Sequence, residues 1–142
     1  MAEYIAALTG GTLYRIETVK PNPSEYKPCT EVAKVEVDEG IRPALKGTVG
    51  NLDQYDTVFV GCPVWWHTAP MALWSFLEND AYDFKGKTIV PFCTYDATYR
   101  NETLAKIVEL TPDSRHLKGF GAVGRNTNGV QAWLKEIGMP GI

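Results

Sequence analysis

The chain has 142 residues, 44% of them hydrophobic and 22% charged, with a formal net charge of −3 at pH 7, which suits one soluble globular domain over residues 1–142. The negative charge argues against nucleic-acid binding, which favours a basic face, and no apolar run approaches the ~18 residues that cross a bilayer. The three cysteines, Cys29, Cys62 and Cys93, are too few for a disulfide framework or a tetrahedral zinc site, and the N-terminus lacks a signal-peptide pattern, so we expect a cytoplasmic protein.

The chain opens on a predicted helix and then a predicted strand. Met1–Leu8 carries apolar side chains at helical spacing, and Gly10-Gly11 can end that helix in a left-handed conformation. Thr12–Val19 alternates apolar and polar residues closely enough to be predicted as a strand. The sequence shows no start signal for this predicted helix.

The next segment is predicted as a loop, a helix and a second loop. Lys20–Pro28 contains three prolines and is expected to be an irregular surface loop. Thr30 can cap a helix that runs to about Glu39 and ends at Gly40. Ile41–Tyr55 is predicted as a loop.

Three further strands are predicted. Asp56–Cys62 is a nearly continuous apolar run, the pattern of a strand buried on both faces. Thr88–Cys93 follows a Lys-Gly-Lys turn and is also predicted to be buried, although Pro91 is unusual in a central strand. Leu117–Val123 is the last predicted strand.

Three helices are predicted between and after these strands. Pro70 suits a first helical turn, and the helix from there to Asn79 is expected to bury Leu73, Trp74, Phe76 and Leu77. The other two helices run from Asn101 or Glu102 to Leu110 and from Asn128 to Ile137. Strands that alternate with helices indicate an α/β fold with a parallel sheet.

Two segments follow the buried strands directly, and ligands of open α/β sheets bind beyond the carboxyl ends of strands. They are rich in aromatic side chains, hydroxyl groups and free backbone groups. This composition suits a flat, conjugated ligand, because aromatic faces stack while backbone groups bind ring edges. The candidate site residues are Pro63, Val64, Trp65, Trp66 and His67 in the first segment, and Thr94, Tyr95, Asp96 and Ala97 in the second.

Structural explanations compete with these functional ones. Trp65 and Trp66 can both serve packing, but two adjacent tryptophans after a strand favour a ligand contact for one of them. His67 is either an acid/base or hydrogen-bonding group, or an exposed loop residue. Cys62 and Cys93 end neighbouring strands as a possible redox pair, although buried apolar thiols are far more common. No nucleophile elbow or glycine-rich phosphate loop is present.

Several stretches together resemble the flavodoxin superfamily, specifically bacterial flavodoxin-like proteins with a long loop. They are YRIETVKPNPSEY (14–26), the helix at 31–33 with Arg42-Pro43, LDQYD (52–56) leading into GCPVWWHTAP, FKGKTIVPFCT (84–94) and VQAWLKEIG (130–138). The resemblance covers essentially the entire chain. It implies a three-layer sandwich of helices around a parallel sheet.

The same resemblance implies FMN as cofactor and an electron-transfer or flavin oxidoreductase function. Family members hold the isoalloxazine between the loops that correspond to residues 63–67 and 94–98. By that mapping Trp65 or Trp66 flanks the ring, and the backbone around Thr94–Ala97 contacts its pyrimidine edge. Tyr26 is a further candidate for lining the site. The electron partner, a redox protein or a small-molecule acceptor, is not specified.

The resemblance also has two departures. Family members begin with a central strand and a Ser/Thr-rich turn that binds the FMN phosphate, whereas this chain begins inside the helix that follows. The first strand and the phosphate loop are therefore expected to be absent, with weaker phosphate binding. In addition, the loop at residues 95–100 has no glycine to let the backbone approach the flavin.

If the central strand is missing, one of two arrangements is expected. The strands at 12–19 and 56–62 pair directly into a four-stranded sheet, a connection that topology permits, or a second chain covers the gap. The rival function is a cofactor-free binding or structural module that forms a homo-oligomer. A third possibility is that the natural chain starts further upstream.

Overall fold

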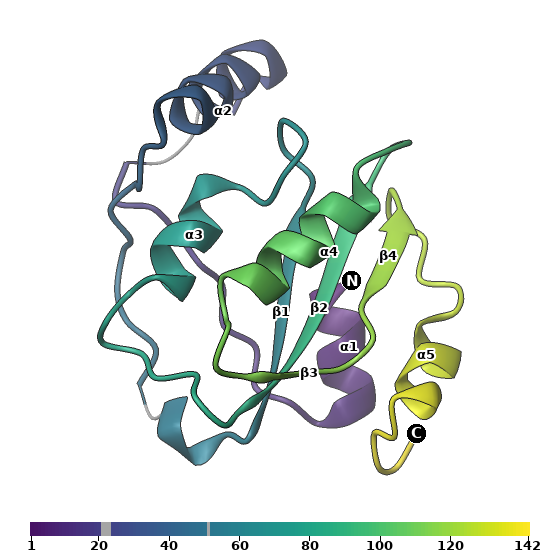
Figure 1. Ribbon diagram of the computed structural model, residues 1–142. Coiled ribbons are helices and arrows are strands. Elements are labelled where there is room, and N and C mark those ends of the chain that lie inside the picture. Colours follow the sequence, from purple (N-terminus) through teal and green to yellow (C-terminus); the bar gives the residue numbers. More distant parts are fainter. Residues whose placement is uncertain (21–23, 51) are drawn as a thin grey trace.

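The computed structural model describes residues 1–20, 24–50 and 52–142 and shows a parallel sheet with helices around it (Figure 1). The strands are β1 (Thr57–Pro63), β2 (Thr88–Tyr95), β3 (Arg115–His116) and β4 (Phe120–Val123). The α-helices are α1 (Ala2–Thr9), α2 (Tyr26–Glu39), α3 (Met71–Leu77), α4 (Arg100–Glu109) and α5 (Val130–Glu136), with a short 3-10 helix η1 (Leu52–Gln54) before β1. Among the described residues, no helix is long and apolar enough to cross a membrane.

Two hydrophobic clusters lie on opposite faces of the sheet, so the predicted three-layer arrangement is confirmed. On one face α3 and α4 cover the sheet and pack against Val60 and Ile89. On the other face α1 and α5 pack against Val90 and Phe92. The side chains of β2 alternate between these clusters, and residues 89–93 are all buried. The central strand β2 thus holds the two halves of the core together.

The predicted last strand, Leu117–Val123, is divided in two. β3 pairs with Thr88 and Ile89 of β2, and β4 pairs with the segment Phe92–Tyr95, all in parallel. The break lies opposite Val90 and Pro91, and a proline has no amide hydrogen to donate to a ladder. Pro91 is therefore tolerated in a central strand at a point where the neighbouring ladder is interrupted.

The strand predicted at Thr12–Val19 is wrong. Residues 11–17 have no regular structure, and Thr18 forms only an isolated antiparallel bridge with Leu45. Leu13 and Val19 are 51% and 63% exposed. An alternating pattern makes a strand only where another strand pairs with it, and this backbone pairs with the loop at residues 44–46 instead.

Direct pairing of residues 12–19 with β1 is consequently wrong as well. Within the described residues β1 pairs only with β2. The expectation that β1 is buried on both faces is corrected in the same way, because Val60 is its only buried residue. An edge strand leaves one row of backbone groups and adjacent side chains partly open to solvent. Whether a second chain covers that edge stays a prediction.

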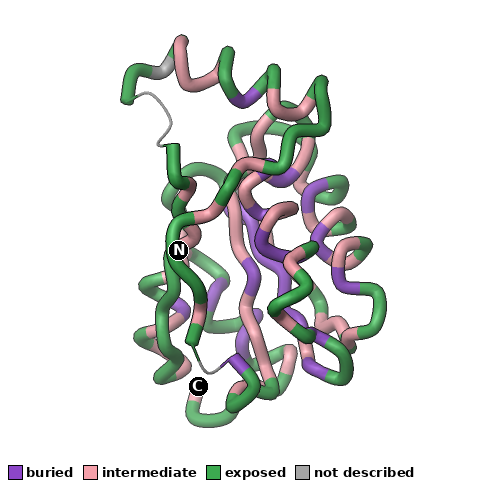
Figure 2. The backbone as a smooth tube through the Cα atoms, turned by 90° about the vertical axis from the view of Figure 1, so that its left-hand side faces the viewer, coloured by how far each residue is buried: buried purple, intermediate pink, exposed green. Residues whose placement is uncertain are grey.

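Helix α2 begins earlier than predicted and stands apart from the rest of the molecule (Figures 1 and 2). Thr30 is not its cap, since the Thr30 hydroxyl donates to the Lys27 carbonyl inside the helix. Pro28 sits in the first turn, where a missing amide hydrogen is harmless. Gly40 ends the helix in a left-handed conformation, as predicted. Part of the predicted loop at 20–28, residues 21–23, lies outside the described residues.

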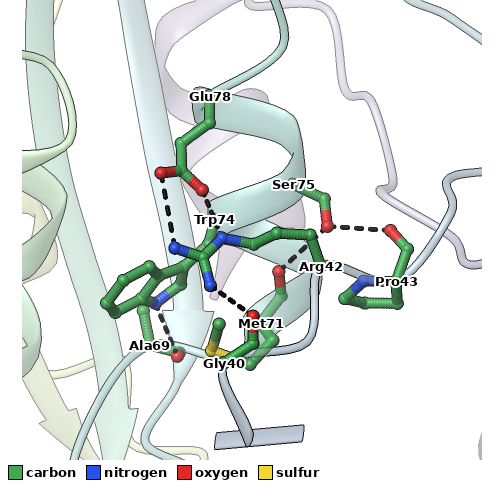
Figure 3. A network of polar contacts seen from close by, with 8 residues as sticks. All are labelled: Gly40, Arg42, Pro43, Ala69, Met71, Trp74, Ser75 and Glu78. Atoms are coloured by element: carbon green, nitrogen blue, oxygen red, sulfur yellow. Dashed lines mark hydrogen bonds and ion pairs between the residues drawn. The ribbon is translucent and has the colours of Figure 1, made fainter.

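A polar network ties the segment after α2 to α3 (Figure 3). Arg42 pairs with Glu78, and its guanidinium lies 4.7 Å from the centre of the Trp74 ring. The ammonium of Lys106 lies 4.8 Å from the same ring. Ser75 donates to the Pro43 carbonyl. Trp74 packs against the core on one side and lies under cationic side chains on the other, so it is half-buried and not fully buried as predicted.

Lys87 is a buried lysine, 9% exposed, whose ammonium donates to the carbonyl oxygens of Leu52 and Tyr55. These bonds fasten η1 to the start of β2. Replacing Lys87 with Met should lower the free energy of unfolding by about 1–3 kcal/mol, because both carbonyl oxygens would lose a charged donor, although the Leu52 carbonyl keeps its bond from the Tyr55 amide. Chemical denaturation measures the change, with the exposed Lys85→Met as control. Equal stability of the two variants would contradict a structural role for this ammonium.

Candidate functional site

A cavity of about 850 Å³ lies at the carboxyl ends of β1 and β2. Four parts of the chain surround it: the first half of α2 with the residues just before it, the end of β1 and the segment after it, the end of β2 and the segment after it, and the residue after β4. Its lining residues are Ser24, Glu25, Cys29, Thr30, Ala33, Pro63, Val64, Trp65, Trp66, His67, Thr94, Tyr95, Asp96, Ala97, Thr98, Tyr99 and Gly124. A volume of this size suits a cofactor-sized ligand.

The segment after β1 forms a two-residue turn. Trp65 and Thr68 exchange both backbone hydrogen bonds, at 2.9 and 3.2 Å. The two residues between them have positive φ, 49° for Trp66 and 71° for His67. Positive φ at both central positions is the pattern of a type I′ turn, which strongly prefers Asn-Gly. The sequence places two bulky side chains there instead.

The segment after β2 presents Tyr99 to this turn. Tyr99 has a φ of 66° and immediately precedes α4. Its ring stacks on His67, with the ring centroids 3.9 Å apart and an interplanar angle of 23°. The two segments are also joined at their bases, where the Val64 amide donates to the Thr94 carbonyl at 3.0 Å. Each of the two segments thus contributes aromatic side chains to the lining of the cavity.

Backbone strain is concentrated at this cavity. Among the described residues, Trp66, His67 and Tyr99 are the only non-glycine residues with positive φ, and all three line it. Such conformations cost of the order of 1–3 kcal/mol each and gather at ligand sites. The observation supports a functional role for this cavity, because packing alone would favour relaxed turns.

All nine residues predicted from the sequence lie around this one cavity. The sequence reasoning missed the contribution of α2, because nothing local indicates that Cys29, Thr30 and Ala33 face the two segments. Tyr99 belongs to the second aromatic segment recognised in the sequence, but it was not among the nine candidate residues. Tyr26 begins α2, but its side chain lies outside the described residues.

The charge of the lining bears on what the cavity can hold. Glu25 and Asp96 are acidic, and no lysine or arginine occurs among the lining residues of the described chain. Five of the lining residues have aromatic rings: Trp65, Trp66, His67, Tyr95 and Tyr99. The described lining is suited to the neutral, conjugated part of a cofactor, and it offers no lysine or arginine to a phosphate.

Cys62 and Cys93 are register partners in β1 and β2, and both are free thiols. Burial raises the pKa of Cys62, and the neighbouring Cys93 raises it further. Burial also raises the pKa of Cys93. Thiols that stay protonated are poor nucleophiles, which favours apolar packing over redox chemistry. Across the described ranges, no group of three His, Cys, Asp or Glu residues is arranged to hold a metal ion.

Comparisons with known proteins agree with this architecture. The family model for flavodoxin matches residues 1–137. A candidate flavoprotein from Bacteroides eggerthii has a TM-score of 0.80 and 31% identity, covering 95% of this chain and 86% of that one. A second from Bacteroides uniformis has a TM-score of 0.78 and 29% identity, covering 94% and 86%.

A more distant structure, a flavoprotein from Lactobacillus acidophilus crystallised in complex with FMN, has a TM-score of 0.73. It is 15% identical and covers 92% of this chain and 86% of its own. At that identity the likeness shows the fold alone. A comparison with curated proteins found no match.

Proposed function

The chain belongs to the flavodoxin family, and from that premise we propose that it binds a flavin, FMN or its dephosphorylated form, in the cavity between the two aromatic segments and serves in electron transfer or flavin-dependent oxidoreduction. The observation that carries the proposal is the convergence of three strained aromatic residues, Trp66, His67 and Tyr99, on one cavity at the carboxyl ends of parallel strands.

The residues of this chain would hold the ring by contacts on its faces and edges. His67 and Tyr99 present flat rings from opposite segments, and Trp65 adds a third aromatic surface. Residues 94–97 line the cavity, and their free backbone groups would suit the polar edge of the ring. A bound flavin supplies the capacity to accept and pass on electrons.

The acidic lining sets a direction for the redox chemistry. Asp96 is exposed at the cavity, and the chain carries a net charge of −3. Negative charge near the ring disfavours an anionic reduced flavin and would lower the reduction potential. A redox titration in which the bound cofactor has a potential at or above that of the free cofactor would contradict this direction.

Titration of the purified chain with FMN and with riboflavin tests the proposal. We expect saturable quenching of flavin and tryptophan fluorescence at micromolar ligand, because the rings would stack on aromatic side chains. The two affinities should lie within about tenfold of each other, since the described lining contains no lysine or arginine to give a phosphate a charge-assisted bond. No quenching by either ligand at millimolar concentration would overturn flavin binding and favour the cofactor-free module.

A further inference from the structure

Helix α2 forms one wall of the cavity although it is joined only lightly to the body of the molecule (Figure 2). Ala33 is the only buried residue among the described side chains of α2. Val32 and Val35, on its outer surface, are 37% and 49% exposed. A helix with so little buried area depends on a few specific contacts for its position.

The side chain of Trp66 supplies such a contact. Its indole Nε1–H donates to the backbone carbonyl of Thr30, at 2.8 Å. The Lys34 ammonium, one turn further along α2, lies 5.8 Å from the centre of the Trp66 ring, within range of a cation–π interaction. Trp66 and Thr30 both line the cavity, so this bond joins the turn after β1 directly to the α2 wall.

The strained turn gives this contact its geometry. A left-handed φ of 49° at Trp66 is unfavourable for a bulky residue, so the surrounding contacts must maintain it. The bond to α2 is one of them. An indole whose N–H is held by a helix carbonyl is restricted in orientation and less free to turn its face toward a ligand.

We propose that Trp66 is a positioning residue that holds α2 against the cavity, and that the aromatic faces for a ligand come from His67, Tyr99 and Trp65. The part concerning a ligand rests on the proposed flavin binding. The role of Trp66 in holding α2 applies to the ligand-free chain and does not depend on flavin binding. This assignment replaces the expectation that either tryptophan of the pair can flank the ring.

Hydrogen–deuterium exchange on the ligand-free chain tests the assignment, with Trp66→Phe as the variant. Phenylalanine keeps an aromatic ring for Lys34 but removes the indole donor. We expect the amides of residues 29–35 to exchange about two- to tenfold faster, the range for one hydrogen bond of ordinary net strength. Because Trp66 is 40% exposed, the variant should fold, and its circular dichroism spectrum checks this.

Trp74→Phe is the matched control. Trp74 also donates its indole N–H to a backbone carbonyl, that of Ala69, and also lies under cationic side chains, but it does not line the cavity. Its replacement should leave the exchange of residues 29–35 unchanged. Unchanged exchange in Trp66→Phe, or equal acceleration in both variants, would overturn the positioning role.

Flavin binding by the Trp66→Phe variant distinguishes this inference from the proposed function. In Trp66→Phe we expect flavin to dissociate faster, with quenching at saturation retained because the stacking rings remain. If quenching at saturation is lost while exchange in α2 is unchanged, Trp66 contacts the ring and the positioning role is wrong. If the unchanged chain binds no flavin, the proposed function fails, and the exchange result alone decides the role of Trp66 in holding α2.

Discussion

Replacing Trp66 and His67 together with Asn and Gly should leave the chain folded but reduce flavin affinity by at least about tenfold. Asn-Gly is the preferred pair for a turn with two positive φ values, so the change relieves strain worth of the order of 1–3 kcal/mol at each position. It also removes the stack on Tyr99 and the indole bond to Thr30. For the free energy of unfolding, the strain that is relieved and the contacts that are removed are of similar size. For flavin binding, nothing offsets the loss of contacts with the ligand.

Thermal unfolding and flavin titration, measured on the same preparation, check this prediction. The free energy of unfolding should stay within about 1 kcal/mol of the original value or rise. The change is the difference between the strain that is relieved and the contacts that are lost. Tyr99→Gly is a companion variant, because Tyr99 has positive φ and lines the cavity from the other segment. Retained flavin affinity in the Asn-Gly variant would show that this turn has no part in binding.

Substituting Gly61 with Ala should destabilise the chain by about 1–3 kcal/mol through overpacking of the core. A methyl group at Gly61 would lie 2.0–2.5 Å from three ring atoms of Phe92, the register partner of Gly61 in β2. Phe92 is 7% exposed and packs in the cluster with α1 and α5. Its ring therefore has little room to move away, and the strands must separate or the ring must leave its position.

Chemical denaturation measures this effect, and two further variants interpret it. Gly50→Ala is the control, since no atom of the described residues lies within 4 Å of a methyl group there. Phe92→Leu should recover part of the stability when combined with Gly61→Ala, because the smaller side chain makes room. Purely additive effects of the two changes would mean that the clash between Gly61 and Phe92 does not govern the packing of β1 on β2.

The position of the candidate site could be predicted from the sequence because the position of this cavity depends on a topological rule. Once two apolar runs are recognised as neighbouring parallel strands, the residues that follow them must meet at one edge of the sheet. Residues 63–67 and 94–97 accordingly surround a single cavity. The pairing of Thr57–Pro63 with Thr88–Thr94 in register brings the two segments to the same level.

The role of each aromatic side chain could not be predicted in this way. Trp66 differs from Trp65 by a hydrogen bond to the Thr30 carbonyl, more than thirty residues away in the chain. The stack of His67 on Tyr99 likewise joins two segments with separate sequence signals. Positive φ at Trp66, His67 and Tyr99 runs against local preference, so propensity gave no indication of it.

The sequence alone determined the α/β class, the faces of most helices and the edge of the sheet where the site lies, since burial leaves a periodic record in the residues of each element. It misjudged Thr12–Val19 and the burial of β1, because alternation reports a tendency to pair and says nothing of the partner. Only the tertiary structure decided that β1 pairs on one side within the described chain, that α2 forms a wall of the cavity and that Trp66 is bonded to it. Those features arise from contacts between distant segments, whose energies no local pattern records.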